Sequence, residues 1–421
     1  MSSTDSSTCS SSDNTSISSD DSNHKENLDL KGKILNKYNI INEIGRGADA
    51  IVWLAFNIKD NNYYAIKVNE PNEYKKGMDE INFIKKLPPH LLCFNHVKES
   101  FVEIVNKKKY ACGVFELHTG NLDCIVRKGE FQNGLPVKIV KKIMYQLLTS
   151  LKYLHTKLKV YHADVKTDNI LLKGYNNYDI SVINQYNEFY KQEGNLTRDK
   201  CHSINREELH TIICEKIVYP DKEERYNIND EYIKRSFVSL SDFGAWCGED
   251  EHYDTDFGTL YYRAPEIILL GETSYPVDIW ASGCVLYELL TGRLLFDPPK
   301  DSERSRDDYH LHLIKMACGN FNFGFVKKTD NFKKFFTIDC KLKKFINSND
   351  TRTLESLLNK YNIKEKTNII EKTNIIEKTN LIEETEIILD LLKGMLTISP
   401  NQRFTVDKCL SHKFFSNLNE N

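Results

Sequence analysis

One stretch near the middle of the chain constrains its fold more than any other part. In "LKVYHADVKTDNILL", residues 158–172, a histidine, two aspartates, a lysine and an asparagine stand between two apolar runs. Charged groups between segments that a protein buries cost free energy unless they serve chemistry. The stretch therefore predicts a functional loop held between two pieces of the core.

The charged residues of this loop suit phosphoryl transfer to a hydroxyl group. That reaction needs a carboxylate to accept the hydroxyl proton, a cation near the transferred phosphate and oxygen ligands for magnesium. Asp164, Lys166 and Asn169 supply these three groups, and Asp242 offers a second metal ligand at the end of the strand-like run "VSLSD". We therefore call residues 162–169 the catalytic loop and expect Mg²⁺ to bind Asn169 and Asp242.

Two further charged residues lie upstream, beyond a glycine-rich turn. Gly45 and Gly47 in "IGRGADAIV" would let backbone N–H groups approach phosphates, although a hairpin turn needs the same glycines. Lys67 stands alone among apolar residues in "YAIKV", and Glu80 follows thirteen residues later. A lysine at a strand end can extend into solvent, but a Lys67–Glu80 pair that grips nucleotide phosphates explains both charges.

The apolar pattern divides the chain into a β-rich part and a helical part. Apolar and β-branched runs separated by turn residues predict strands in residues 38–117, and helical spacing dominates residues 118–416. We therefore expect an α+β fold with a small N-lobe and a larger C-lobe. Residues 174–236 are polar without a sustained period, which indicates an insertion, and the "EKTNII" repeat in residues 364–383 indicates a low-complexity expansion.

The composition of the chain limits where the protein can be located and which partners it can bind. Serine occupies eleven of the first 22 positions, so residues 1–37 are expected to be a disordered tail that is either regulatory or merely solubilising. No signal peptide is evident, and the longest apolar runs are too short to span a bilayer. The eleven cysteines include no C-x-x-C pair, and the net charge is −3. We therefore expect an intracellular monomer, cytoplasmic or nuclear, without nucleic-acid or membrane partners.

Taken in order, these motifs and the later "RAPE", "DIWASG" and Arg403 resemble the signature of eukaryotic-type Ser/Thr protein kinases. The resemblance covers residues 38–416. It implies a bilobal fold in which a five-stranded N-lobe with one main helix is hinged to a helical C-lobe, with ATP between them. The segments "VWLAFN", "TLYYRAPE" and "HLHLIKMACGNF" are most similar to the SR-protein kinase branch of the CMGC group.

The resemblance also implies a role for each site residue. Asp164 would be the catalytic base, Lys166 would contact the γ-phosphate, and Lys67, oriented by Glu80, would hold the α- and β-phosphates. The remaining residues would surround ATP from the glycine-rich turn, the hinge and the adenine floor: Ile44, Gly45, Arg46, Gly47, Ala48, Asp49, Ala50, Ile51, Val52, Ala65, Lys67, Phe115, Glu116, His118 and Leu171.

Three supporting contacts are expected around the catalytic loop. Glu266 and Arg403 form a plausible buried ion pair. Asp278, at the start of a helix, would hold the loop backbone through capping-type hydrogen bonds. Thr259 is expected to hydrogen-bond the same loop.

These observations favour an ATP-dependent serine/threonine kinase that acts on proteins. The acidic stretch "DPPKDSERSRDDYH" suggests Arg/Ser-rich substrates, although its own arginines can equally neutralise it. The alternative is a pseudokinase scaffold that binds nucleotide or partners without transfer. A small-molecule phosphotransferase of related fold is disfavoured, because such enzymes lack the "TLYYRAPE" segment that shapes a peptide groove.

Ala163 stands where many kinases have an arginine that binds a phosphate on the activation segment, here residues 242–266. An alanine cannot form that ion pair. Aromatic residues of the segment offer another way to order it by packing. We therefore expect activity without activation-segment phosphorylation, unless another basic residue such as Arg263 or Lys166 receives the phosphate.

Overall fold

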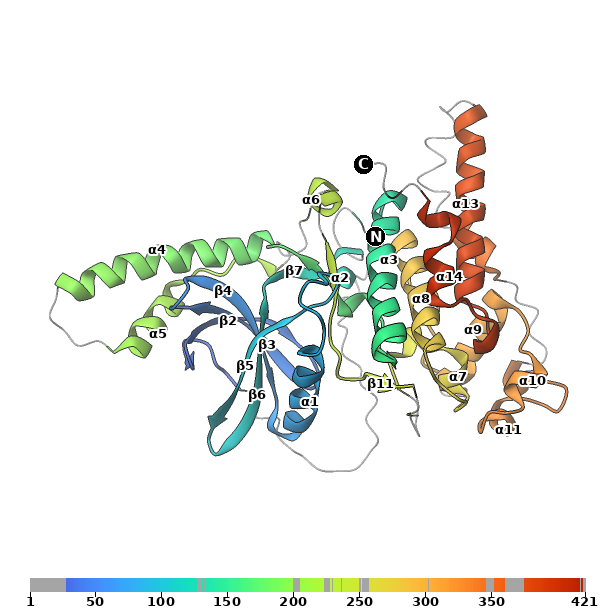
Figure 1. Cartoon of the computed structure of the whole chain (residues 1–421), viewed down its shortest axis with the longest axis horizontal. Helices are drawn as coiled ribbons and strands as arrows, with labels where there is room; N and C mark the ends of the chain where they lie inside the picture. The colour runs from blue at the N-terminus through green and yellow to red at the C-terminus, as the bar shows by residue number, and fades with distance from the viewer. Residues whose placement is uncertain are drawn as a thin grey trace, which may run out of the picture.

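The computed structural model describes residues 28–126, 131, 133–199, 205–222, 228, 230–235, 237–249, 251, 257–301, 303–345, 352–359, 375–416 and 418. Strands gather in a small N-terminal lobe and helices dominate the larger C-terminal lobe, which confirms the expected α+β fold (Figure 1). The serine-rich residues 1–27 lie outside the described part of the chain.

The N-lobe is built on one antiparallel six-stranded sheet. Its strand order is β1-β2-β3-β4-β6-β5. The resemblance implied five strands, and the additional strand is the short β1, which pairs with β2. The strands are β1 (Ile34–Leu35), β2 (Tyr38–Arg46), β3 (Ala50–Asn57), β4 (Asn62–Asn69), β5 (Val97–Val105) and β6 (Lys108–Glu116).

Strand β1 corrects the expected boundary of the disordered tail. That tail was predicted to end at residue 37, but Leu30 and Leu35 are buried against the sheet. Gly32 N also donates a hydrogen bond to Ile40 O at 3.0 Å. The two leucines join this segment to the core, whereas average composition over the whole tail hides them.

The helix α1 (Tyr74–Ile84) lies close to the sheet because of one glycine. A Cβ atom built on Gly77 would lie only 2.4 Å from Asn69 Cγ on β4. A larger residue would force either the Asn69 side chain or α1 to shift. This close approach matters for the site, because β4 carries Lys67 and α1 carries Glu80.

The C-lobe packs around α8 (Pro276–Thr291), which is buried along its whole length apart from its first residue. Helices α3 (Val137–Tyr153) and α13 (Ile375–Met395) contact it. Apolar residues predominate in α8, and its buried polar residues, such as Asp278 and Glu288, have hydrogen-bond partners. Further α-helices of the C-lobe in the described part of the chain include α2 (Leu122–Val126), α7 (Pro265–Ile268), α9 (Arg306–Cys318), α10 (Phe323–Val326), α11 (Phe332–Phe335) and α14 (Val406–Leu410).

Short strands place the loops of the C-lobe at the lobe boundary. One small sheet has the order β10-β9-β7, and β8 pairs with β11. The catalytic loop connects β8 to β9. The strands are β7 (His118–Asn121), β8 (Val160–Tyr161), β9 (Ile170–Lys173), β10 (Val238–Leu240) and β11 (Cys247–Gly248).

The expected ion pair between Glu266 and Arg403 is confirmed. Arg403 Nη1 lies 2.6 Å from Glu266 Oε1, and Nη2 lies 2.9 Å from Oε2. Both side chains are buried, and the guanidinium also lies over the Trp280 ring. This bidentate pair ties the end of the activation segment to the last part of the C-lobe.

The described parts of the insertion at residues 174–236 contain three helices and cover part of one face of the N-lobe sheet. These helices are α4 (Asn177–Asp199), α5 (Arg206–Lys216) and α6 (Asp230–Arg235), and α4 runs beside the sheet (Figure 1). Apolar side chains of α4, α5 and the following residue bury three residues of the sheet. The cluster contains Ile41, Leu54 and Phe56 from the sheet and Tyr178, Val182, Tyr186, Ile213, Cys214 and Ile217 from the insertion.

A buried hydrogen-bond chain fixes the insertion on the sheet. Tyr186 Oη accepts from Asn39 Nδ2 at 2.9 Å and lies 3.1 Å from His210 Nδ1. His210 Nε2 donates to Ile40 O at 2.8 Å, so Nδ1 is left to accept from the tyrosine. Burial lowers the pKa of His210 to about 4, which keeps this imidazole neutral at physiological pH.

The described part of the "EKTNII" repeat is helical. Residues 364–374 lie outside the described part of the chain, but α13 begins at Ile375, inside the repeat. Later residues of α13, including Ile388, Leu391 and Leu392, are buried in the C-lobe. Among the described residues, no helix is long and apolar enough to cross a membrane.

The hydrogen-bond chain predicts that the Tyr186 hydroxyl stabilises the fold. Tyr186→Phe leaves Asn39 Nδ2 and His210 Nδ1 buried without this partner, which should cost about 1–3 kcal/mol of unfolding free energy. Tyr190→Phe is the matched control, because Tyr190 lies one turn further along α4 and is 37% exposed. Thermal unfolding checks both variants, and equal shifts would contradict the assigned role.

Candidate active site

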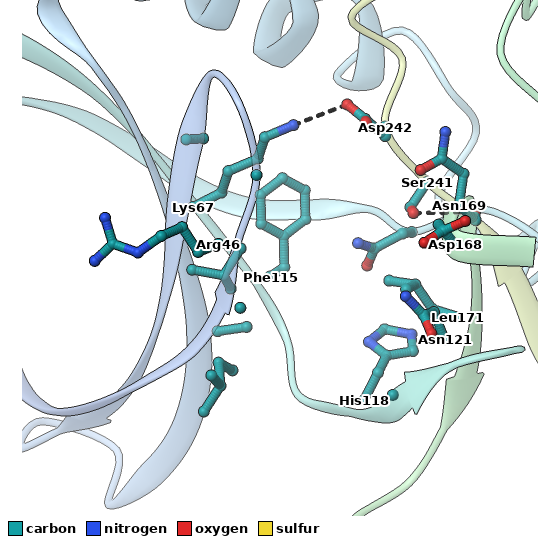
Figure 2. A pocket seen from close by; sticks show the side chains of 18 of the residues that line it. Arg46, Lys67, Phe115, His118, Asn121, Asp168, Asn169, Leu171, Ser241 and Asp242 are labelled. Atoms are coloured by element: carbon teal, nitrogen blue, oxygen red, sulfur yellow. Dashed lines mark hydrogen bonds and ion pairs between the residues drawn. The ribbon is translucent and has the colours of Figure 1, made fainter. Parts of the chain in front are cut away.

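A cavity of about 620 Å³ lies between the two lobes. It brings together residues that are far apart in the sequence, and Figure 2 shows several of them facing one another across it. From the set predicted by sequence, the cavity is lined by Ile44, Gly45, Arg46, Gly47, Ala48, Asp49, Ala50, Val52, Ala65, Lys67, Glu80, Phe115, Glu116, His118, Asp164, Lys166, Asn169, Leu171 and Asp242.

One residue of the predicted set points away from the cavity. Ile51 is buried on the opposite face of the sheet, together with Trp53. Successive side chains of a strand point to opposite faces, so Ala50 and Val52 face the cavity and Ile51 cannot. Ile51 was placed among the ATP-binding residues as part of the glycine-rich stretch, and its side chain lies outside the cavity wall.

Lys67 connects the N-lobe to the C-lobe at the centre of the cavity. Its Nζ lies 2.9 and 2.8 Å from the two carboxylate oxygens of Glu80. The same atom lies 3.0 Å from Asp242 Oδ1 (Figure 2). Although burial opposes the charged form, Asp242 and Glu80 raise the pKa of Lys67. In turn, the lysine lowers the pKa of Asp242 to about 2. Lys67 and Asp242 are therefore charged at neutral pH, whereas burial raises the pKa of Glu80 and the neighbouring lysine opposes that rise.

The catalytic loop holds Asp164 in one orientation. Asp164 Oδ1 accepts from Thr259 N at 3.0 Å and Thr259 Oγ1 at 2.8 Å, which confirms the expected contact of Thr259. Asp164 Oδ2 lies 2.8 Å from Lys166 Nζ and 3.2 Å from Asn169 Nδ2. Because the amide nitrogen of Asn169 donates to Asp164, the amide oxygen Oδ1 of Asn169 is the atom suited to a metal ion.

Asp278 holds the loop backbone, as expected from its place at the start of α8. Its Oδ2 accepts from His162 N at 2.8 Å and His155 Nε2 at 2.9 Å, and its Oδ1 accepts from Ala163 N at 3.0 Å. Ala163 has a φ of 68°, a left-handed conformation that is unfavourable for any residue other than glycine. The buried carboxylate therefore stabilises a strained turn directly before Asp164.

The hinge side of the cavity contains a neutral histidine. His118 Nδ1 lies 2.9 Å from Glu116 O, and Nε2 lies 3.0 Å from Ser239 Oγ. Burial lowers the pKa of His118, so the imidazole adds no charge beside the place expected for adenine. Leu171, on β9, lies on the same side of the cavity (Figure 2).

Sequence reasoning missed several residues of the cavity wall. Asn176 and Asp179 come from the insertion and form a buried cap: Asn176 Nδ2 donates to Thr119 O at 2.7 Å and to Asp179 Oδ2 at 2.6 Å. An Asn-x-x-Asp pair before a helix is a capping signal that the sequence contains. The missed residues are Asn69, Lys76, Ile84, Asn95, Thr119, Gly120, Asn121, Cys124, Ile125, Asp168, Asn176, Asp179, Ile228, Ser241, Gly244 and Ala245.

The described parts of the activation segment are held by aromatic packing and hydrogen bonds. Trp246 stacks on Phe83 of α1 with ring centroids 4.6 Å apart. Tyr262 is buried, and its hydroxyl donates to Glu288 at 2.6 Å. Tyr253, another expected aromatic anchor, lies outside the described residues.

Comparison with known proteins identifies the family. The family model described as protein kinase domain matches residues 38–184 and 179–415. A candidate serine/threonine-protein kinase of Acanthamoeba polyphaga mimivirus is 24% identical over 93% of this chain and 88% of its own length. The serine/threonine-protein kinase SRPK of Physarum polycephalum is 29% identical over 73% of this chain and 72% of its own. The serine/threonine-protein kinase AFC1 of Arabidopsis thaliana is 27% identical over 91% of this chain and 72% of its own length.

The chain therefore belongs to the protein kinase family, and within it to the CMGC group of serine/threonine kinases. It is a protein serine/threonine kinase that uses ATP as the phosphate donor and proteins as acceptors.

Proposed function

We propose that the cavity between the lobes binds ATP with Mg²⁺ and that Asp164 acts as the base in phosphate transfer to a Ser or Thr hydroxyl. The observation that carries this proposal is the arrangement of Asp164. Four donor groups from Thr259, Lys166 and Asn169 hold its two oxygens at the edge of a cavity that also contains Lys67 and Asp242.

Each residue then has a defined task. Lys67, oriented by Glu80, holds the α- and β-phosphates, and Lys166 places its charge beside the transferred phosphate. Asn169 Oδ1 and the Asp242 carboxylate are oxygen ligands of the type that Mg²⁺ prefers. Bound there, the ion would neutralise phosphate charge. Asp164 orients the acceptor hydroxyl and takes its proton.

The purine would lie between the two lobes, against apolar side chains of both. Val52 and Ala65 line the cavity from the N-lobe and Leu171 from the C-lobe. The backbone of Glu116 and His118 at the hinge supplies the polar edge, and Phe115 closes the rear. This placement follows the resemblance to protein kinases and agrees with the side of the cavity on which each residue lies.

The scaffold alternative is disfavoured by the completeness of the site. A kinase-shaped scaffold has no need for Asp164 to be held by Thr259, Lys166 and Asn169 at once. The same holds for the pairing of Lys67 with Glu80 and Asp242. These contacts support phosphate transfer.

Asp164→Asn tests the assignment of the base. The variant should lower kcat by about a hundredfold to ten-thousandfold and leave the Kd for ATP nearly unchanged, because the base orients the acceptor and does not hold the nucleotide. Lys67→Met should also abolish transfer. Asp330→Asn, on the surface of the C-lobe, controls for the substitution itself. Wild-type turnover in Asp164→Asn would show that the assignment is wrong.

We propose Arg/Ser-rich proteins as substrates, because acidic side chains gather around the start of α9. They are Asp297, Asp301, Glu303, Asp307 and Asp308. The guanidinium of Arg304 lies 4.8 Å from the Phe345 ring centroid, and Arg306 donates to Pro298 O at 3.3 Å. Arg304 and Arg306 therefore contact a ring and a backbone carbonyl, and they neutralise the neighbouring carboxylates less than their number suggests. Asp308 caps α9 through Ser305, so it contributes less to an external surface.

A peptide library tests this substrate class. Arg-Ser repeat peptides should exceed acidic peptides by about tenfold in kcat/KM, mainly through faster association. Neutralising the exposed Asp297 and Glu303 together to Asn and Gln should reduce this preference. Glu215→Gln combined with Glu355→Gln, at two exposed positions outside α9, is the matched control. A preference for acidic peptides would remove the proposal.

We infer further that the kinase does not depend on a phosphate in residues 242–266. Ala163 offers no charge to such a phosphate, whereas Asp278 already fixes the turn that contains it. Lys166 is engaged by Asp164 and Thr259, and Arg263 Nε donates to Gly258 O at 3.0 Å. The candidate phosphorylation site Thr255 lies outside the described residues.

Three sequence-based expectations stay predictions. They are a monomeric state, the absence of nucleic-acid and membrane partners, and a location in the cytoplasm or nucleus.

A further inference from the structure

An additional ion pair lies at the phosphate end of the cavity. Lys76 Nζ on α1 donates to Asp49 Oδ2 in the turn between β2 and β3, at 2.5 Å, and both residues line the cavity. The backbone on either side of Asp49 is held as well: Gly47 N donates to Ala50 O at 2.9 Å, and Glu70 N donates to Asp49 O at 3.1 Å. The pair therefore joins the tip of the glycine-rich turn to α1.

Lys76 occupies the face of α1 that serves the site. It lies four residues before Glu80, so the two side chains share one face of the helix. A Cβ atom built on Gly244 would lie 3.4 Å from Lys76 Cε, which places the lysine stem beside the residue two positions after Asp242. Although burial opposes the charged form, Asp49 is the main group that raises the pKa of Lys76. The side chain thus stays a cation among the turn, α1 and the Asp242 loop.

The charge of Asp49 would be unfavourable without this partner. The triphosphate of ATP is strongly negative, and a bare carboxylate at the tip of the turn that covers it would repel it. Lys76 neutralises that carboxylate and shortens the gap between the turn and α1. The two side chains are 48% and 40% exposed, so solvent screens the pair and its effect is modest.

We propose that Lys76 is a positioning residue for ATP, which straps the tip of the glycine-rich turn to α1 through Asp49. α1 therefore makes two contacts at once: Lys76 holds the tip of the turn, and Glu80 binds Lys67. The position of the turn over the phosphates is in this way coupled to the position of α1. This inference rests on the proposed placement of ATP in the cavity. It assigns Lys76 a contact with Asp49 and not with the nucleotide.

Single and double variants separate the strap from a direct phosphate contact. Lys76→Met should raise the KM for ATP by about fivefold, because it breaks the strap and leaves the Asp49 carboxylate bare. Asp49→Asn should raise it by about twofold, since only the strap is lost. The Asp49→Asn/Lys76→Met double variant should resemble Asp49→Asn, and Lys76→Arg should resemble wild type. In all four, kcat should change by less than about twofold.

The result that would overturn the proposal is a double variant as impaired as Lys76→Met, because Lys76 would then act on the nucleotide itself. Unchanged KM in both single variants would overturn it too. Lys85→Met is the matched control, since Lys85 ends the same helix and donates to Ser100 Oγ outside the cavity. Measuring the Kd for ATP without any acceptor keeps this test separate from the proposed function, which Asp164→Asn tests through turnover.

Discussion

Both carboxylate oxygens of Asp278 accept hydrogen bonds from the backbone of His162 and Ala163, and the geometry of the site depends on these contacts. Asp278 lies in α8, the buried helix at the centre of the C-lobe, so its carboxylate has a rigid base. It stabilises the left-handed turn at Ala163, and this turn directs Asp164 towards the cavity. His162 Nε2 then donates to Ser241 O at 3.0 Å, which links the same turn to Asp242.

Short contacts also join the central charged groups of the site. Asp242 meets Lys67, and Lys67 meets Glu80 on α1, which approaches β4 closely because residue 77 is glycine. On the other side, Thr259 and Lys166 hold the two oxygens of Asp164. Each contact joins two different segments of the chain, so the site forms only when both lobes and the activation segment are in place.

The sequence predicted the centre of the site well and its borders poorly. Charged residues between apolar runs, such as Asp164 and Lys67, have few physical explanations, and the order of the motifs removed the remaining ambiguity. Ile51 was included among the ATP-binding residues because residues 44–52 were taken together. Side chains alternate along β3, however, and this alternation directs the Ile51 side chain to the other face of the sheet. The insertion was missed as a structured element because its core contacts use Tyr178 and Tyr186 among polar neighbours. Their spacing with Val182 at every fourth residue was a weak signal for one helical face.

The most direct test compares two ways of disturbing the catalytic turn. Turnover is measured at saturating ATP and peptide for wild-type protein before and after complete dephosphorylation, and for Asp278→Asn. Asparagine keeps the volume but has a single acceptor oxygen. If contacts within the chain position Asp164, dephosphorylation should lower kcat by less than about tenfold, whereas Asp278→Asn should lower it by more than that while the Kd for ATP is retained. A loss of more than about tenfold on dephosphorylation, with Asp278→Asn still active, would contradict this account.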